Sequence, residues 1–188
     1  MANPDRPLRL GTRASPLALA QAHMVRDALI VAHGWSHEAV EIMPTVATGD
    51  RVQDRALAEV GGKALWTKEL DAALLSGDID FAVHSMKDVE TERSSKLAIA
   101  AMLPRADVRD RLVGAASFDA LPHGAAFGTS APRRRAQVLR LRPDLRVILL
   151  RGNVQTRLSK LAGGEVDATL LASAGLERLG MHETGTCL

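Results

Sequence analysis

Short apolar segments alternate with amphipathic segments along most of this chain of 188 residues. The apolar runs "LRLG" at 8–11, "FAVHS" at 81–85 and "DATLLA" at 167–172 are typical of buried strands. Between such runs apolar residues recur at helical spacing, as in "TKELDAALLSG" at 67–77. Because strands that alternate with helices usually form a mainly parallel sheet covered by helices, the sequence predicts an α/β fold.

Residues at the expected element ends support this pattern. Ser15 is a good N-cap for a helix that begins at Pro16, and Gly34 suits the position just after its last turn. Asn153 is the expected cap of a second helix, "VQTRLSKLAGG", in which Val154, Leu158 and Leu161 would form the buried side. The run "LAIAAML" at 97–103 predicts a further strand.

Composition and length favour two lobes with real cores. The chain has 24 Lys plus Arg against 22 Asp plus Glu and is 46% hydrophobic, which excludes a disordered chain. A break near residues 104–110 divides it into lobes at 1–104 and 105–188. No apolar run approaches the ~20 residues of a membrane span, and no secretion signal opens the chain, so we expect a cytoplasmic protein without a membrane partner. With Cys187 as the only cysteine, we expect neither a disulfide framework nor a clustered metal site.

Small, polar or basic residues follow several of the predicted strands. "GTRASP" at 11–16 and "GTSAPR" at 128–133 both join a strand to a helix, where unpaired backbone N–H groups and the helix dipole favour an anion. The arginine run at 133–135 opens the second of these helices, and arginine pairs two-pronged with carboxylates. The alternative is a solvated helix face, with Arg135 the member most expected to point away. The pattern therefore predicts an anion site in a groove between two lobes.

Lys87 and Asp88 follow the strand at 81–85 directly. A carboxylate at the end of a buried strand needs a partner or a function, although Asp88 could also serve only as a helix N-cap. His84 is expected to be a hydrogen-bonded interior side chain rather than a catalyst. Lys63 in "GGK" resembles part of a phosphate-binding loop, but the full pattern of that motif is not satisfied, so no nucleoside triphosphate site is expected.

Taken together, five segments resemble the porphobilinogen deaminase (hydroxymethylbilane synthase) family. They are "LRLGTRASPLALAQA", "GDR", "VGGKALWTKELDAALLSGDIDFAVHSMKDV", "GTSAPRRRAQ" and "LRGNVQTRLSKLAGGEVDATLLASAGLERLG", which occur in the order and at the spacing of the family. The resemblance covers nearly all of the chain. It implies two lobes with a periplasmic-binding-protein-like (type II) architecture and stepwise condensation of four porphobilinogen molecules into hydroxymethylbilane, with loss of ammonia, in tetrapyrrole (haem) biosynthesis.

The resemblance also implies roles for individual residues. Asp88 takes the catalytic position, and the segment from Thr48 to Gly62 takes that of an active-site lid. A dipyrromethane cofactor and the substrate would be held through their carboxylates. The residues implied for this binding are Arg13, Ser15, Lys63, Ser85, Lys87, Thr129, Ser130, Arg133, Arg134, Arg151, Gly152, Arg157 and Arg178.

The chain departs from the family pattern in two respects. Family members continue into a third α+β domain, which carries the cysteine that anchors dipyrromethane; Cys187 does not match that cysteine, so no attachment site is expected in this chain. We therefore expect a truncated deaminase, a monomer like its family, with little or no turnover. "DVETER" and "ADVRD" also replace the prolines usual in "DVPTE" and "EDPRD", which loosens turns.

Two other function classes remain open at this point. A non-catalytic two-lobed receptor for a polycarboxylate would need the same arginines but not the pair formed by Lys87 and Asp88. Nucleic-acid binding is favoured by the arginine run at 133–135. However, aromatic residues make up only 3% of the chain and tyrosine is absent, so no stacking platform is evident and we expect no nucleic-acid partner.

Overall fold

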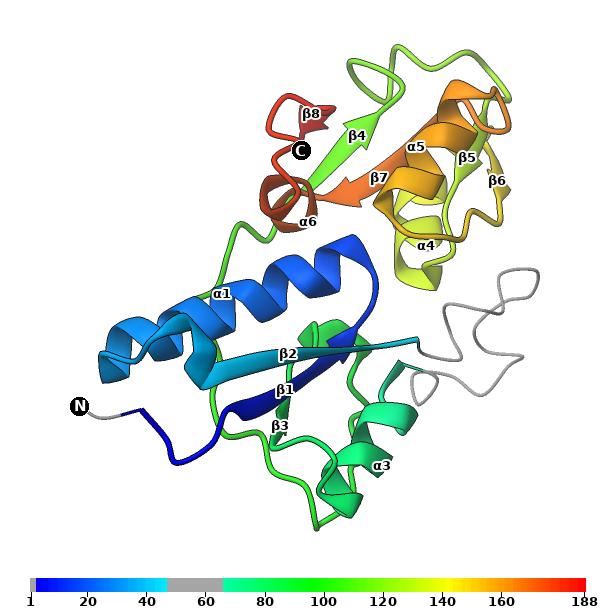
Figure 1. Cartoon of the computed structure of the whole chain (residues 1–188). Helices are drawn as coiled ribbons and strands as arrows, with labels where there is room; N and C mark the ends of the chain where they lie inside the picture. The colour runs from blue at the N-terminus through cyan, green and yellow to red at the C-terminus, as the bar shows by residue number, and fades with distance from the viewer. Residues whose placement is uncertain (1–2, 47–65) are drawn as a thin grey trace. The chain divides into compact units, whose positions relative to one another are not determined.

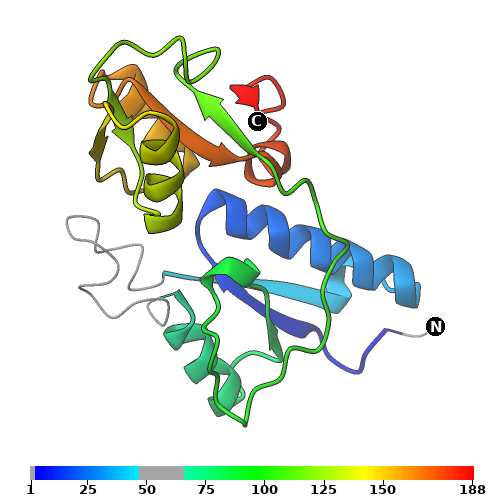
Figure 2. The same cartoon turned by 180° about the vertical axis from the view of Figure 1, so that it is seen from behind.

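The computed structural model describes residues 3–46 and 66–188. The chain divides into two compact units, Met1–Pro104 and Arg105–Leu188. Each unit combines a small sheet with helices, so the chain is a mixed α/β protein with parallel strands (Figures 1 and 2). Within the described residues no helix is long and apolar enough to cross a membrane.

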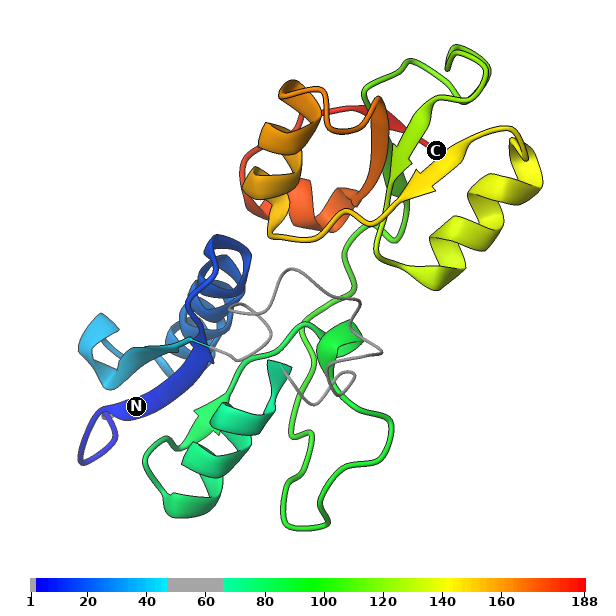
Figure 3. The ribbon, with the colours of Figure 1, turned by 90° about the vertical axis from the view of Figure 1, so that its right-hand side faces the viewer.

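Unit 1 is built on a parallel sheet of three strands in the order β2-β1-β3. The central strand β1 places Leu10 between Ile42 of β2 and Phe81 of β3. Helices α1 and α3 lie on opposite faces of this sheet, as Figures 1 and 3 show. The elements are β1 (Leu8–Arg13), α1 (Pro16–His33), η1 (His37–Ala39), β2 (Val40–Thr45), α3 (Lys68–Ser76), β3 (Phe81–Ala82) and η4 (Met86–Asp88).

The predicted ends of the unit 1 helices are confirmed. The Ser15 hydroxyl accepts a hydrogen bond from the backbone N–H of Ala18, and Gly34 closes α1 in the left-handed conformation with φ 64°. Gly77 closes α3 in the same way, with φ 77°. The Ser15 cap fixes the start of α1 at Pro16, and two residues separate this helix from the end of β1.

Unit 2 has a mixed sheet in the order β6-β5-β7-β4-β8. Strand β5 pairs in parallel with β6 and β7, whereas β4 is antiparallel to β7 and β8. Its core contains Leu112, Phe127, Val138 and Leu170. The elements are β4 (Asp110–Val113), β5 (Ala126–Gly128), α4 (Pro132–Leu141), β6 (Arg146–Ile148), α5 (Val154–Ala162), β7 (Ala168–Ala172), α6 (Ser173–Arg178) and β8 (Thr186–Cys187).

The second predicted cap is confirmed as well. The side chain of Asn153 accepts a hydrogen bond from the N–H of Thr156, at 2.9 Å, and begins α5. Val154, Leu158 and Leu161 of this helix pack against a cluster formed by Val113, Leu171 and Leu176. The buried side of α5 is therefore the one that the helical spacing predicted.

Three predictions about strands need correction. Residues 97–103 form no strand, and Ile99 and Met102 are 51% and 71% exposed, because this apolar run has no partner strand among the described residues. The strand predicted at 81–85 is limited to Phe81–Ala82. Unit 2 is also less parallel than predicted, since β4 and the unpredicted β8 run antiparallel to their neighbours.

Candidate functional site

Two of the predicted site residues in unit 1, Arg13 and Asp88, are in contact. A guanidinium nitrogen of Arg13 lies 3.3 Å from Oδ2 of Asp88, and the two side chains are 16% and 23% exposed. The Arg13 guanidinium also lies over the ring of Trp66, 4.0 Å from its centroid, in a cation–π contact. Trp66 is a residue that the sequence reasoning missed, because nothing in "GGKALWTKEL" indicates which side chain its ring covers.

The parallel pairing of β1 and β3 brings these residues together. Arg13 is the last residue of β1, and three residues separate the end of β3 from η4, which ends at Asp88. The N–H of Val83 donates to the carbonyl of Gly11 at 2.9 Å, which keeps the chain beyond β3 aligned with β1. Since parallel strands end at the same edge of a sheet, Arg13 and Asp88 meet at its carboxyl end, where α/β sheets usually bind ligands.

The other unit 1 candidates have more varied surroundings. The Ser15 hydroxyl caps α1, and the Ser85 hydroxyl contacts Oε1 of Gln21 at 2.7 Å. Lys87 is exposed. Asp88 does not cap a helix N-terminus, because it is the last residue of η4 and Ser85 is the residue that precedes this turn. Lys63 and the segment predicted as a lid lie outside the described residues.

A network of charged side chains lies beside this pair and was also missed. Arg93 bridges two carboxylates: one nitrogen lies 2.6 Å from Oδ1 of Asp71 and another lies 3.0 Å from Oε2 of Glu90. The hydroxyl of Thr67, which is fully buried, donates to Oε1 of Glu90 at 2.6 Å. Burial would raise the pKa of Glu90, but the hydrogen bond from Thr67 and the charge of Arg93 bring it below its ordinary value.

His84 lies at the edge of this network. Its Nε2 atom is buried and has no hydrogen-bond partner within the described part of the chain. Burial lowers the pKa of His84, against the opposing influence of the Asp71 carboxylate, so the imidazole is neutral at pH 7. The predicted interior position is therefore found, but the predicted hydrogen bond is not found at this nitrogen.

In unit 2, the residues predicted at 129–134 lie where β5 leads into α4. Thr129 is buried, and its hydroxyl accepts a hydrogen bond from the N–H of Ala131 at 3.1 Å. Ser130 is half-buried and Arg133 is exposed. Arg134 is only 8% exposed and turns inward, which the sequence could not distinguish from the orientation of Arg133.

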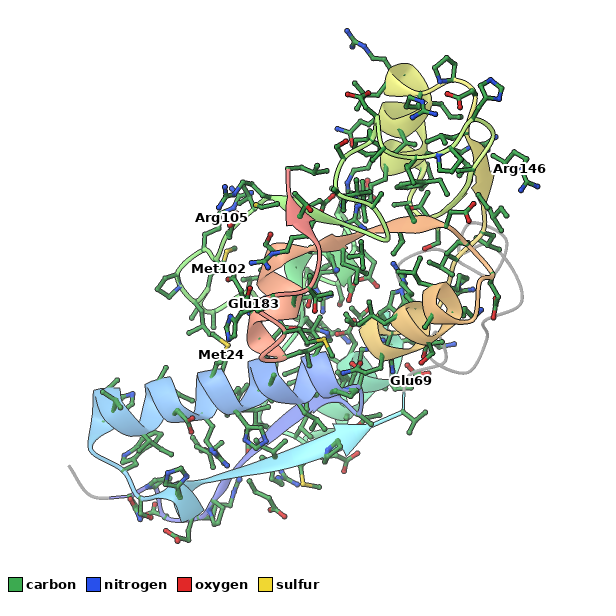
Figure 4. The ribbon with its side chains drawn as sticks, turned by 90° about the horizontal axis from the view of Figure 1, so that it is seen from above. Met24, Glu69, Met102, Arg105, Arg146 and Glu183 are labelled. Carbon is green, nitrogen blue, oxygen red and sulfur yellow. The ribbon has the colours of Figure 1, made fainter. Side chains whose placement is uncertain are left out.

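All three nitrogens of the Arg134 guanidinium donate hydrogen bonds within unit 2. Its Nε and one terminal nitrogen bind the two carboxylate oxygens of Asp110, at 2.8 and 2.6 Å, and its other terminal nitrogen donates to the carbonyl of Leu170 at 3.1 Å. This two-pronged pair ties α4 to β4 and β7. By contrast, Arg146 of β6 is exposed and projects away from the ribbon in Figure 4. Arg134 and Arg146 thus have quite different surroundings within the same unit.

The remaining candidates of unit 2 follow β6 and β7, which end at the same sheet edge as β5. Arg151 is 5% exposed, and Nε of Arg157 donates to the carbonyl of Gly152 at 3.0 Å. Gly152 has φ 113°, and a Cβ atom at this position would meet the Thr156 side chain at 2.6 Å, so only glycine fits here. Arg178, at the end of α6, has a buried Nε without a hydrogen-bond partner among the described residues.

These features define an α/β protein in which guanidinium and hydroxyl groups follow the carboxyl ends of parallel strands, a class suited to binding carboxylate or phosphate groups. The sequence model described as "Porphobilinogen deaminase, dipyromethane cofactor binding domain" matches residues 8–188. The chain belongs to the porphobilinogen deaminase family. The resemblance stated from the sequence is thereby confirmed, and the receptor alternative gains no support.

Three relatives illustrate the similarity. The chain is 68% identical to porphobilinogen deaminase of Sphingopyxis alaskensis over 98% of its own length and 60% of that protein. It is 55% identical to that of Paracoccus denitrificans, over 96% of this chain and 58% of the relative. The porphobilinogen deaminase of Nitrobacter winogradskyi is 56% identical over 94% of this chain and 57% of the relative. The chain thus spans about three fifths of the length of the relatives that it matches.

Proposed function

We propose that this chain carries the substrate-binding and catalytic residues of a porphobilinogen deaminase, or hydroxymethylbilane synthase. In this reaction four porphobilinogen molecules are joined head to tail into hydroxymethylbilane, and each condensation releases ammonia. The observation that carries the proposal is the contact between Arg13 and Asp88, at 3.3 Å, at the carboxyl end of the central strand in a member of this family.

The two units would divide this work between them. Residues 1–104 form a catalytic lobe, and residues 105–188 form an arginine-rich lobe that binds carboxylates. Each unit represents one lobe of a periplasmic-binding-protein-like, type II architecture, which the parallel pairings of β1 with β2 and of β5 with β6 and β7 support. The protein acts as a cytoplasmic monomer on a small molecule, without a nucleic-acid or membrane partner.

Asp88 is the residue that stabilises the positive charge formed on the pyrrole during the reaction. When the C–N bond of the protonated aminomethyl group breaks, the electron pair leaves with ammonia, and positive charge spreads over the pyrrole to its N–H. A fixed carboxylate beside that N–H stabilises the charge as it develops and can accept or return a proton. Arg13, which contacts both the Trp66 ring and Asp88, holds the carboxylate in place.

The basic residues bind carboxylates rather than take part in bond breaking. Each porphobilinogen carries an acetate and a propionate, and arginine forks fix such groups in orientation as well as in distance. The exposed Arg133 is the clearest candidate for this contact in unit 2, because Arg134 is engaged with Asp110. The remaining proposed ligands are Arg13, Ser15, Lys63, Ser85, Lys87, Thr129, Ser130, Arg151, Gly152, Arg157 and Arg178.

The donor groups that follow β5 and β6 also suit the four carboxylates of a dipyrromethane. When bound, this cofactor supplies the terminal pyrrole to which the first substrate is joined. Thr129, Ser130, Arg133 and Arg151 would hold it through hydroxyl and guanidinium donors. We do not assign Cys187 as its anchor, because this exposed residue lies on the edge strand β8 and pairs across to Arg111 of β4.

Binding and chemistry can be tested separately. We expect isothermal titration to detect porphobilinogen binding and to detect none for its dimethyl ester, in which both carboxylates are blocked. Ammonia release is followed with protein in excess of substrate, and intact-mass spectrometry records any addition of pyrrole units to the protein. Equal binding of the ester, or ammonia release that does not depend on Asp88, would contradict the proposal.

A further inference from the structure

The segment that follows Asp88 departs from the pattern usual in this family. In "DVETER", Glu90 stands where the pattern "DVPTE" has a proline. A proline fixes its own φ and stiffens the turn, whereas a glutamate leaves the backbone free to move unless its side chain is held. In this chain the side chain is held on both oxygens, by the Thr67 hydroxyl at 2.6 Å and by Arg93 at 3.0 Å.

The contacts of Glu90 lead back to the reactive carboxylate. Thr67 directly follows Trp66, whose ring lies 4.0 Å below the guanidinium of Arg13. Arg13 in turn contacts Asp88 at 3.3 Å, and Asp88 precedes Glu90 by two residues. A continuous series of contacts therefore runs from Asp88 through Arg13, Trp66 and Thr67 to Glu90, two residues after Asp88.

We propose that Glu90 and Arg93 are positioning residues, which hold the Asp88 turn against Trp66 and Arg13. Their ion pair and hydrogen bonds would restrict the turn, as the ring of a proline does in the family pattern. Arg93 is suited to this because its planar fork reaches Asp71 on α3 and Glu90 after η4 at once, at 2.6 and 3.0 Å. A lysine carries its three N–H donors on one nitrogen, so it cannot reproduce contacts that are made by two separate nitrogens. Neither Glu90 nor Arg93 touches substrate in this proposal.

The exposure of these side chains sets the size of the expected effect. The side chains of Arg93, Asp71 and Glu90 are 16%, 23% and 24% exposed, so the pairs are screened less than surface pairs but are not deeply buried. Their loss should loosen one turn rather than unfold unit 1. The proposal rests on the function proposed for Asp88, but the position of Trp66 can be measured without any substrate.

The first measurement uses Trp66 as a reporter. The chain has two tryptophans, so Trp35→Phe leaves Trp66 as the only one, and phenylalanine preserves an aromatic ring against His33. In this background we expect Arg93→Gln and Glu90→Gln to raise the iodide quenching constant of Trp66 by about two-fold and to weaken its near-UV circular dichroism, because the Thr67 contact loosens. Arg93→Lys should fall between Arg93→Gln and the parent.

Arg26→Gln is the matched control, because it removes the same charge from a pair between Arg26 and the adjacent Asp27 on α1. It should leave both signals unchanged. If Arg93→Gln and Glu90→Gln also leave the quenching constant and the circular dichroism unchanged, the positioning role is wrong. If the double variant shows the sum of the two single effects, the two residues do not act together, and the proposal is also overturned.

The second measurement asks whether positioning reaches Asp88. With folding verified by urea titration, Arg93→Gln should lower Asp88-dependent ammonia release by about ten-fold while the Kd for porphobilinogen stays within about two-fold, because only the reactive turn is displaced. A matched loss of affinity and rate would show a general structural role instead. If the parent neither binds porphobilinogen nor releases ammonia, the proposed function fails, and the Trp66 signals still decide the positioning role.

Discussion

Both units contain an arginine–aspartate pair that joins two elements of the fold, yet the two pairs differ in how many carboxylate oxygens the arginine contacts. In unit 2, Arg134 binds both oxygens of Asp110 at 2.6 and 2.8 Å and adds a bond to the Leu170 carbonyl. In unit 1, Arg13 reaches Asp88 through Oδ2 alone, at 3.3 Å, while its flat face lies on Trp66. The first pair is two-pronged, whereas the second is a contact through one carboxylate oxygen.

This difference separates a structural role from a chemical one. A guanidinium that has all its nitrogens engaged within the protein lowers the free energy of the fold and has little capacity left for a ligand. A longer contact through one oxygen orients a carboxylate and leaves its other oxygen available for a ligand. We therefore propose that Arg134 belongs to the framework of unit 2, whereas the family resemblance implied that it binds substrate; the catalytic role remains proposed for Asp88.

The largest expected effect comes from Asp88→Asn. The amide keeps the size and shape of the side chain but cannot stabilise developing positive charge, so ammonia release should fall at least 100-fold. Affinity for porphobilinogen should change by less than about three-fold, because the arginines bind its carboxylates. Single-turnover ammonia release and isothermal titration measure the two quantities. A fall in affinity as large as the fall in rate would place Asp88 in binding and abolish the distinction between the pairs.

The second largest effect should be on the stability of unit 2. Arg134→Gln leaves the partly buried Asp110 carboxylate without its two-pronged partner, and we expect the free energy of unfolding to fall by about 3 kcal/mol. Arg133→Gln, one residue earlier and exposed, should change it by less than about 0.5 kcal/mol and should instead weaken porphobilinogen binding by about ten-fold. Far-UV circular dichroism during urea unfolding follows both units, whereas tryptophan fluorescence follows unit 1, where both tryptophans lie; a change in circular dichroism without a change in fluorescence therefore reports on unit 2. Equal stability of the two variants would contradict the structural role of Arg134.

A smaller effect tests how the loop after β6 holds Arg157. Gly152→Ala places a Cβ atom against Thr156 at a φ of 113°, so we expect a loss of about 2 kcal/mol in the free energy of unfolding and a displaced Gly152 carbonyl. Gly164→Ala is the control, since its φ of 75° is also unfavourable but no atom lies within 4 Å of the added carbon. It should cost about 1 kcal/mol. Urea titration of both variants separates steric contact from backbone strain.

Sequence patterns identified most of the fold because the information is local. The ends of α1 and α5 depend on Ser15, Gly34 and Asn153, whose effects reach only a few residues along the chain. The strand predicted at 97–103 is wrong because a strand needs a hydrogen-bonded neighbour, which an apolar run cannot specify. The antiparallel β8 was missed for the same reason, since "TC" is too short to give a pattern.

The site was predictable as a set of residue types but not as a set of contacts. Polar residues after strands indicated which segments matter, and the structure brings Arg13 and Asp88 together. Which arginine turns inward depends on the partner, and Asp110 lies 24 positions before Arg134 in the sequence. The stacking of Arg13 on Trp66 likewise depends on tertiary packing, so no spacing rule reveals it.

The smallest expected effect concerns a third kind of pair, on the surface of unit 1. Arg6 binds both oxygens of Asp80, at 2.7 and 2.6 Å, and is 58% exposed. The hydrogen bond from Arg6, with one from the N–H of Arg9, holds the pKa of Asp80 well below its ordinary value. A carboxyl group with a depressed pKa in the folded state stabilises the protein above its unfolded pKa of about 3.9, and this contribution is lost as the pH falls through the folded value.

Arg6→Gln should therefore lower the urea midpoint of unit 1 slightly at pH 7, and the difference from the parent should shrink as the pH falls below about 4. Tryptophan fluorescence measures this unit alone, because both tryptophans belong to it. The corresponding change in unit 2 is Arg109→Gln, where the hydrogen bond from Arg109 lowers the pKa of Asp107 to about 2. Its effect should fade over the same interval and be nearly gone at pH 2. If the difference in urea midpoint between variant and parent increased as the pH fell, the lost arginine would have acted by repelling other cations rather than by holding its carboxylate. The distinction between the two-pronged inward pair, the pair at the site and the surface pair would then be wrong.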